Sequence, residues 1–290
     1  MASLKEIKGR INSVKSTQKI TSAMKMVSSA KLRVAQNRIE SFLPYQQKLT
    51  EIMKSFLSSE TDYVSPLSVK REVNAVAIIA ISSNSSLCGA FNSNVIKLLK
   101  QTLNEYSQIP KENIYLYPIG KKIEDAIKKE GLPIQGSFVH LMEKPNFEET
   151  KNIADTLIKD FLTKKIDTVI LLYNHFKSAA CQLPTKKQFL PIKFTKKQYN
   201  ANNISTDYIV EPDNITILES LIPKSLRIKL YASILDSAAA EQAARTVAMQ
   251  IATENANEIL SDLTIQYNKQ RQQAITSELL DIIGGSEALK

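Results

Sequence analysis

The residue types that most often do chemistry in proteins are few in this chain and stand apart. His140 and His175 are the only histidines, and neither has a serine, cysteine or carboxylate nearby in a pattern typical of a nucleophile and its base. Cys88 and Cys181 lack a second Cys or His at the spacing of a zinc site, and we expect both to be free thiols. The sequence predicts no catalytic or metal centre, and His175, at the end of a strand, is expected to be structural.

The acidic pairs have simple structural explanations. Glu148 and Glu149 start a predicted helix, where negative charge suits the helix dipole. Glu124 and Asp125 belong to an amphipathic helix of the surface type. Neither pair is typical of a catalytic acid and base.

Phosphate-binding motifs are also missing, since the chain contains neither GxGxxG after a strand nor GxxxxGK[ST]. The loop "SSNSSLCGAFN" (82–92) follows the first predicted strand, where α/β folds bind ligands. Its Ser and Asn side chains are suited either to line a site or to cap the next helix. A small-ligand α/β enzyme therefore remains an alternative.

The middle of the chain, residues 70–215, alternates strands with helices. Aliphatic runs typical of buried strands are followed by helical patterns, which predicts a small parallel α/β domain. The predicted strands are 73–82, 113–120 and 167–176, the helices are 93–107, 121–131 and 147–165, and 181–194 is an extended addition to the sheet.

Both ends of the chain predict very long helices. Between Gly9 and Pro44 there is no Gly or Pro for 34 residues, enough for a helix of roughly 50 Å. Pro44 is expected to kink this helix rather than end it. Between Pro223 and Gly284 the gap is 60 residues, or about 90 Å of helix. We expect the two helices to form an antiparallel pair, with the longer C-terminal tip unpaired.

The apolar residues of these helices predict where the pair meets. The N-terminal seam begins with 3-4-3 spacing and then drifts around the helix. Its residues are Leu4, Ile7, Ile11 and Val14, followed by Ile20, Met24 and Val27. The C-terminal helix carries an alanine row beside an aliphatic row, and we expect both to face the partner. They are Ala240, Ala244, Ala248, Ala252 and Ala256, and Val247, Ile251, Asn255, Ile259 and Leu263.

The net charge of +9 is concentrated at the N-terminus. Residues 1–39 carry nine basic side chains against Glu6 alone, a net +8. Such a one-signed field predicts an acidic partner, either nucleic acid, anionic lipid or an acidic protein surface. Residues 1–41 lack aromatic side chains for stacking on bases. A basic coiled-coil scaffold or nucleic-acid-binding adaptor nevertheless remains an alternative.

Membrane and export signals are weak. No apolar run approaches the length of a membrane-spanning helix, and "MASLKEIKGRIN" lacks the apolar centre of a secretory signal. The same segment is basic and somewhat amphipathic, so a transit peptide is an alternative.

Four stretches, in order, resemble one family. They are "IKGRINSVKSTQKITSAMKMVSSAKL" (7–32), "LCGAFN" (87–92), "AAEQAARTVAMQIATENA" (239–256) and "YNKQRQQAITSELLDIIGGSEAL" (267–289). Together they resemble the gamma subunit of bacterial-type F-type ATP synthase over the whole chain. No cysteine pair of the kind that regulates chloroplast versions is inserted.

The resemblance implies a fold and a function. The fold is α/β, a long antiparallel coiled coil of the N- and C-terminal helices (1–60 and 216–290) with an inserted Rossmann-like α/β domain (70–215). The function is that of a non-catalytic rotor shaft, which couples proton-driven rotation of the c-ring to ATP synthesis or hydrolysis at the beta subunits. Its partners would be three alpha and three beta subunits, the epsilon subunit and the c-ring, with no cofactor and no nucleic acid. It would lie peripherally at the cytoplasmic face of the bacterial inner membrane.

The resemblance also implies roles for single residues. Met24 matches a shaft methionine near an acidic loop of a beta subunit, and we expect Lys19 and Lys25 to face the same acidic surface. The polar shaft residues implicated in coupling match Arg245, Gln272, Thr276, Glu278 and Asp281. Asp281 stands where the family often has Glu. The loop residues Asn84, Ser85 and Ser86 depart from the family pattern of an Asp, a basic residue and Gly.

Overall fold

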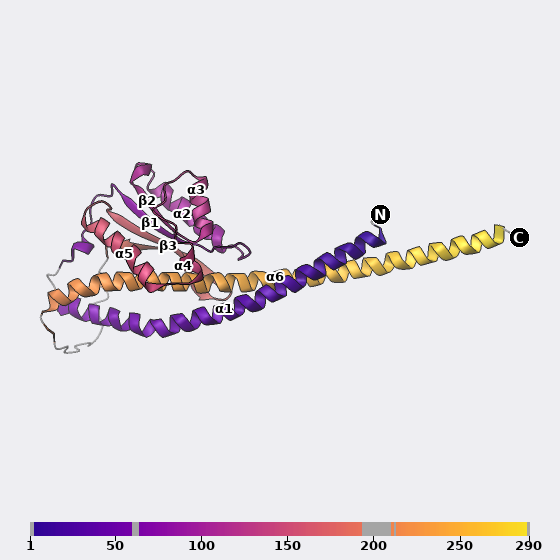
Figure 1. Cartoon of the computed structure of the whole chain (residues 1–290), viewed down its shortest axis with the longest axis horizontal. Coiled ribbons are helices and arrows are strands. Elements are labelled where there is room, and N and C mark those ends of the chain that lie inside the picture. The colour runs from indigo at the N-terminus through magenta and orange to yellow at the C-terminus, as the bar shows by residue number, and fades with distance from the viewer. Residues whose placement is uncertain (1–2, 60–63, 193–209, 212, 289–290) are drawn as a thin grey trace. The chain divides into compact units, whose positions relative to one another are not determined.

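The computed structural model describes residues 3–59, 64–192, 210–211 and 213–288. They divide into two compact units, one of residues 1–28 with 245–290 and one of residues 29–244. Two long helices, α1 (Leu4–Ser59) and α6 (Asn214–Ala288), contribute to both units (Figure 1). α1 continues through Pro44, as predicted, and α6 through Pro223.

A four-stranded sheet lies at the centre of the second unit. Its order is β2-β1-β3-β4, with β1 parallel to β2 and β3, and β3 antiparallel to β4. The strands are β1 (Val76–Ile81), β2 (Ile114–Ile119), β3 (Thr168–Ser178) and β4 (Cys181–Leu190). The three predicted strands and the extended addition are confirmed, although residues 193–194 of the addition lie outside the described residues.

Short helices complete this unit. They are α2 (Phe91–Glu105), α3 (Lys121–Lys129), α4 (His140–Glu143) and α5 (Phe147–Leu162), with 3-10 turns η1 (Pro66–Ser68) and η2 (Lys111–Asn113). The sequence did not predict α4 or the two turns, which are too short to show a periodic pattern.

Each face of the sheet has its own apolar core, because alternate strand residues point to opposite faces. Val76 and Ile78 of β1 pack with residues of α2 and α3. Ala77 and Ile79 pack with α5 and with the first part of α6. The stripe of α6 that does this recurs every four residues, namely Leu218, Ile222, Leu226, Leu230 and Ile234.

The loop after β1 caps α3 rather than α2. Asn84 Oδ1 accepts from the Lys121 backbone N–H at 3.0 Å, and Ser82 Oγ accepts from that of Ile123 at 2.9 Å. The N-cap of α2 has no side-chain hydrogen bond. Gly120, with φ +102°, allows this close approach, since a Cβ there would lie 2.1 Å from Ser82 O. Of the two alternatives for this loop, capping of the next helix along the chain, α2, is therefore wrong.

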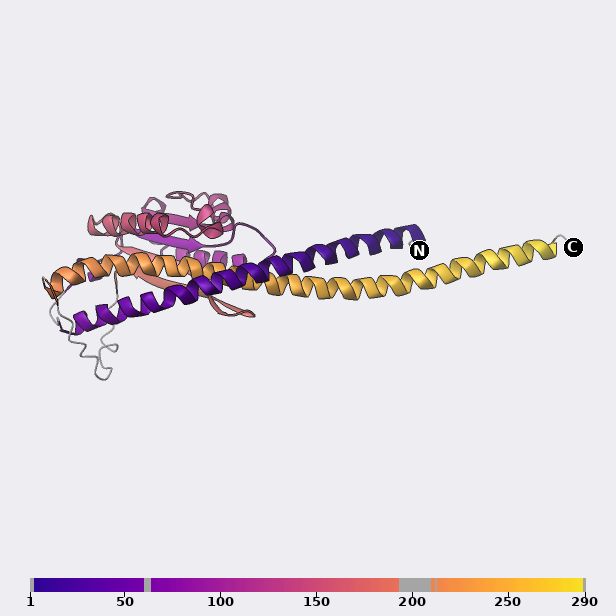
Figure 2. The same cartoon turned by 60° about the horizontal axis from the view of Figure 1, so that its bottom comes forward.

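In the first unit, α1 and α6 form an antiparallel coiled coil (Figure 2). Gln18 Nε2 donates to Asn257 Oδ1, and Thr253 Oγ1 donates to Thr21 Oγ1, both at 2.8 Å. The buried and half-buried positions that recur with alternating three- and four-residue steps are Leu4, Ile7, Ile11, Val14, Gln18, Thr21, Lys25 and Ser28 on α1. On α6 the matching positions are Thr253, Ala256, Leu260, Leu263, Tyr267 and Gln270.

This heptad seam corrects part of the predicted contact. Ile20 and Val27 are 60% and 56% exposed, and Ile251 and Ile259 are 52% and 49% exposed, so none of them lies in the seam. The physical reason is that a coiled coil keeps a spacing of 3.5 residues, whichever side chains fall there. Apolar residues off that spacing are left outside.

The alanine row is corrected for a related reason. Residues four apart turn about 40° around a helix, so the five alanines spread over about 160°, which is wider than the narrow seam with one partner helix. Ala240 and Ala244 pack against Cys88 and Phe91 in the second unit, whereas Ala256 is buried in the coil.

The C-terminal helix outruns its partner, as predicted. The Gln18–Asn257 contact places the start of α1 near residue 271 of α6. Beyond that point the aliphatic side chains are exposed, among them Ile275, Leu279, Leu280, Ile282 and Ile283.

Candidate functional site

The predicted coupling residues all lie in the coiled-coil unit. On α1, Lys19 is exposed, while Met24 and Lys25 are half-buried. Lys25 occupies a seam position, so only part of its side chain is open to another protein.

On α6 the predicted residues lie beyond the paired region. Gln272, Thr276, Glu278 and Asp281 are exposed, and the Thr276 hydroxyl donates to Gln272 O at 2.9 Å. One shallow hollow of the helix surface is lined by Lys269, Gln272, Gln273, Thr276, Ser277 and Leu280. Thr276 is 20 residues from Ala256, which lies opposite Lys19, so about 30 Å of helix separates the two groups. The structure therefore places the predicted residues in two groups along the helices rather than one.

Arg245 differs from the other predicted residues because it is buried, with 7% of its surface exposed. A contact of Arg245 with another protein would therefore involve only the edge of its side chain.

In the second unit, α6 fills the place where α/β folds usually bind ligands. In this sheet that place lies outside the carboxyl ends of β1 and β3, where the strand order reverses. Ala240 and Ala244 of α6 pack there against Cys88 and Phe91, with Phe176 beside them. Asn174 of β3 donates to Phe91 O at 2.9 Å.

The polar side chains of the loop after β1 bond to the protein itself. Ser83 Oγ lies 3.0 Å from Asn92 Oδ1, and Asn92 Nδ2 donates to Cys88 Sγ at 3.1 Å. Asn84 Nδ2 donates to Val139 O at 2.9 Å. These bonds give the loop a structural role, and they explain what Asn84 does where the sequence departs from its family pattern.

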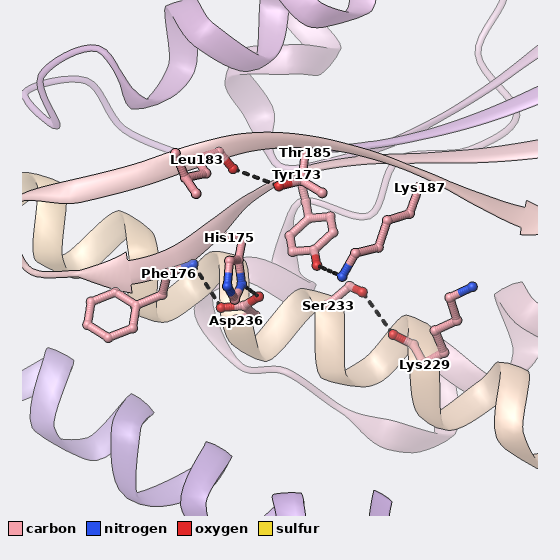
Figure 3. A network of polar contacts seen from close by, with 9 residues as sticks. All are labelled: Tyr173, His175, Phe176, Leu183, Thr185, Lys187, Lys229, Ser233 and Asp236. Atoms are coloured by element: carbon pink, nitrogen blue, oxygen red, sulfur yellow. Dashed lines mark hydrogen bonds and ion pairs between the residues drawn. The ribbon is translucent and has the colours of Figure 1, made fainter. Parts of the chain in front are cut away.

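A polar network fixes the long hairpin of β3 and β4 to α6 (Figure 3). Asp236 on α6 contacts His175 Nδ1 at 2.6 Å and accepts from the Phe176 backbone N–H at 2.9 Å. Lys229, about two helical turns earlier on α6, donates to Gln188 O at 3.0 Å. Its burial, and next the charge of Lys187, lower the pKa of Lys229.

His175 lies within β3 rather than at its end, and it joins the strand to α6. An aromatic cluster adds to the contacts between the α/β unit and α6. In it, Tyr231 of α6 stacks edge-on with Phe42 of α1 and Phe147 of α5. The α/β unit is thus held on the long helix by apolar, polar and aromatic contacts together.

Within the described ranges, none of the helices combines the length and apolarity that crossing a bilayer requires. The same residues include no group of three or more His, Cys, Asp or Glu side chains placed to hold a metal ion.

Comparison with known proteins decides the family. The family model described as ATP synthase matches residues 3–289. The ATP synthase gamma chain of Phocaeicola vulgatus is 53% identical over 99% of this chain and all of its own length. That of Bacteroides fragilis is 54% identical with the same coverage. The chain belongs to the ATP synthase gamma family.

Solved structures agree on the fold. The rotor of Euglena gracilis mitochondrial ATP synthase matches with a TM-score of 0.65 at 20% identity, covering 94% of this chain and 98% of that one. Family membership therefore confirms the resemblance drawn from the terminal motifs and sets aside the scaffold, adaptor and small-ligand enzyme alternatives.

Sequence reasoning missed the α6 residues that bind the rest of the α/β unit. Asp236, Lys229 and Tyr231 come from the middle of a continuous helical pattern, where no local signal marks a contact with a distant strand. The only available hint was charge and aromatic character on an otherwise aliphatic and alanine-rich stretch.

Proposed function

We propose that this chain works as the central shaft of ATP synthase, coupling rotation of the c-ring to ATP synthesis or hydrolysis. As a gamma subunit it is non-catalytic, and catalysis resides in the beta subunits of the complex. Its partners are the alpha, beta and epsilon subunits and the c-ring. The observation that carries the proposal is the extension of α6 past its coil partner, with exposed aliphatic side chains along the tip.

Coupling through a shaft requires differential contact rather than chemistry. Each orientation of the shaft presents a different face to a given beta subunit and so favours one of its conformations. Because contact and conformation are linked, a nucleotide bound at the beta subunit also favours one shaft orientation.

We place the coupling contacts at the predicted residues. Lys19, Met24 and Lys25 would meet an acidic loop of a beta subunit, and the tip residues Gln272, Thr276, Glu278 and Asp281, with the edge of Arg245, would meet further ring surfaces. The half-buried position of Lys25 makes Lys19 the more accessible of the two lysines.

The cellular location of the chain and the roles of its segments follow from the same proposal. The chain would lie at the cytoplasmic face of the bacterial inner membrane, held there by its complex. Residues 1–60 and 216–290 would form the shaft, and residues 70–215 would form the part that meets the epsilon subunit and the c-ring.

Charge removal tests the proposed contact. Changing Lys19, Lys25, Lys31 and Arg33 to Gln should lower ATP-driven proton pumping relative to ATP hydrolysis, because the acidic partner loses its counter-charges. The Met24→Lys variant, which crowds the same surface, should do so as well. The measurement is the ratio of pumping to hydrolysis in membrane vesicles.

A matched control removes equal charge elsewhere. Four exposed lysines of the α/β unit, Lys111, Lys121, Lys129 and Lys144, are changed to Gln. An unchanged ratio in the first quadruple variant, or an equal loss in the control, would contradict the proposed contact.

A further inference from the structure

Two lysines lie between the β3–β4 hairpin and α6. Figure 3 shows Lys187 extending from β4 and Lys229 extending from α6 into this region. Lys187 Nζ donates to Tyr173 Oη at 2.6 Å, and Lys229 Nζ donates to Gln188 O at 3.0 Å. Each ammonium also lies over an aromatic ring, Lys187 at 5.1 Å from the ring of Tyr173 and Lys229 at 5.9 Å from that of Phe189. The two cations therefore occupy one region between strand and helix.

The charges of these two lysines are not balanced by an acid. Within the part of the chain that the structure describes, no carboxylate pairs with either ammonium. Asp236 of α6 does bond to this hairpin, but to His175 and to the Phe176 backbone N–H. Burial, and next the charge of Lys187, lower the pKa of Lys229, so the surroundings disfavour its charged form. An anion placed beside both ammoniums would remove this penalty.

The ammonium donors that remain in this region suit an anion with several oxygen atoms. A lysine ammonium has three N–H donors, and Lys187 and Lys229 each use one of them on a described acceptor. Tyr173 is 1% exposed, so its hydroxyl holds the Lys187 ammonium at a fixed place. Phosphate carries about two negative charges and offers several acceptor oxygens, whereas a carboxylate offers one charge and two oxygens. Two neighbouring ammoniums therefore match phosphate in charge.

We propose that Lys187 and Lys229, with Tyr173 positioning the first, form a binding site for a phosphate group, either inorganic phosphate or the phosphate of a nucleotide. The bound anion offsets the repulsion between the two ammoniums and links β4 to α6. This site lies in the second unit, apart from the coil contacts, and the shaft function does not require it. Because an adjacent anion favours the charged ammonium, binding also lowers the fraction of neutral, reactive amine.

Limited acetylation of the full chain tests the site. The chain is treated with acetic anhydride in millimolar phosphate, in millimolar ATP, or in chloride of equal ionic strength, and mass spectrometry measures the acetylated fraction of each lysine. Phosphate or ATP should lower acetylation of Lys187 and Lys229 at least about threefold, because the anion favours the charged ammonium. Exposed Lys177 on the same hairpin is the internal control and should not change. Protection by inorganic phosphate identifies a free-phosphate site, and protection by ATP alone identifies a nucleotide site.

A pair of variants tests whether the two lysines act together. Lys187→Gln should abolish the protection of Lys229, because one of the two cations is gone, whereas the neighbouring change Lys186→Gln should keep it. Both changes replace exposed side chains, so both variants are expected to fold. Protection of Lys229 that survives Lys187→Gln, equal protection of Lys177, or no protection by either anion would overturn the proposal. Each of these results would leave the shaft function intact.

Discussion

At the scale of single residues, hydrogen bonds decided several roles that residue type alone did not. Glu124 was expected on a surface helix, yet it is buried and accepts from Lys128 and from Ser137 Oγ, the latter at 2.6 Å. Asn84 was expected near a ligand or a cap, and it caps a helix 37 residues further along the chain. These hydrogen-bond partners are brought together by the tertiary fold, which the local sequence pattern does not encode.

Glu124 makes a prediction that depends on pH. The bonds from Lys128 and then Ser137 hold the pKa of Glu124 below its usual value. The carboxylate therefore stabilises the fold above the pKa of the unfolded chain, and this contribution is lost as pH falls through the lower pKa of the folded chain. Glu124→Gln should cost about 1–2 kcal/mol at pH 7 and less at acidic pH.

Urea unfolding between pH 7 and pH 3 checks this expectation, with Glu112→Gln on the exposed turn η2 as the control. A Glu124→Gln cost that stays constant across this range would argue that the carboxylate charge contributes nothing.

At the scale of elements, the sequence predicted the sheet better than the coil. Strands β1, β2 and β3 begin as aliphatic runs, and that pattern is retained because both faces of the sheet are covered there. The coil seam was predicted from apolar residues alone and went wrong after Val14, where the heptad continues through Gln18 and Thr21. The heptad spacing of the coiled coil, rather than the hydrophobicity of the side chains, determines which residues lie in the seam.

The seam makes its own prediction about stability. Ile7 is 3% exposed in the seam, whereas Ile259 is 49% exposed outside it. Ile7→Ala should destabilise the coil by about 2–3 kcal/mol because it leaves a cavity, and Ile259→Ala by less than about 0.5 kcal/mol. Hydrogen exchange of the amides of residues 4–28 measures the difference. Equal effects of the two changes would show that the seam is misplaced.

At the scale of the whole molecule, the arrangement of the helices and the α/β unit fits a rotating, non-catalytic subunit. Helix α6 fills the crevice of the α/β unit, holds its hairpin through Asp236, and continues into the coil. The terminal motifs of the sequence were enough to indicate the family, whereas the contacts between α6 and the sheet were seen only in the structure. Torque applied to the α/β unit would therefore reach α6 through a broad contact.

The central claim is that this chain rotates within its complex as ATP is hydrolysed. The direct measurement immobilises the alpha and beta subunits and follows a bead on a cysteine placed at the exposed Lys177, with Cys181 changed to Ser. The account predicts stepwise, one-directional rotation that depends on ATP and slows as ATP is diluted. A bead that only fluctuates while the same complexes hydrolyse ATP would contradict it.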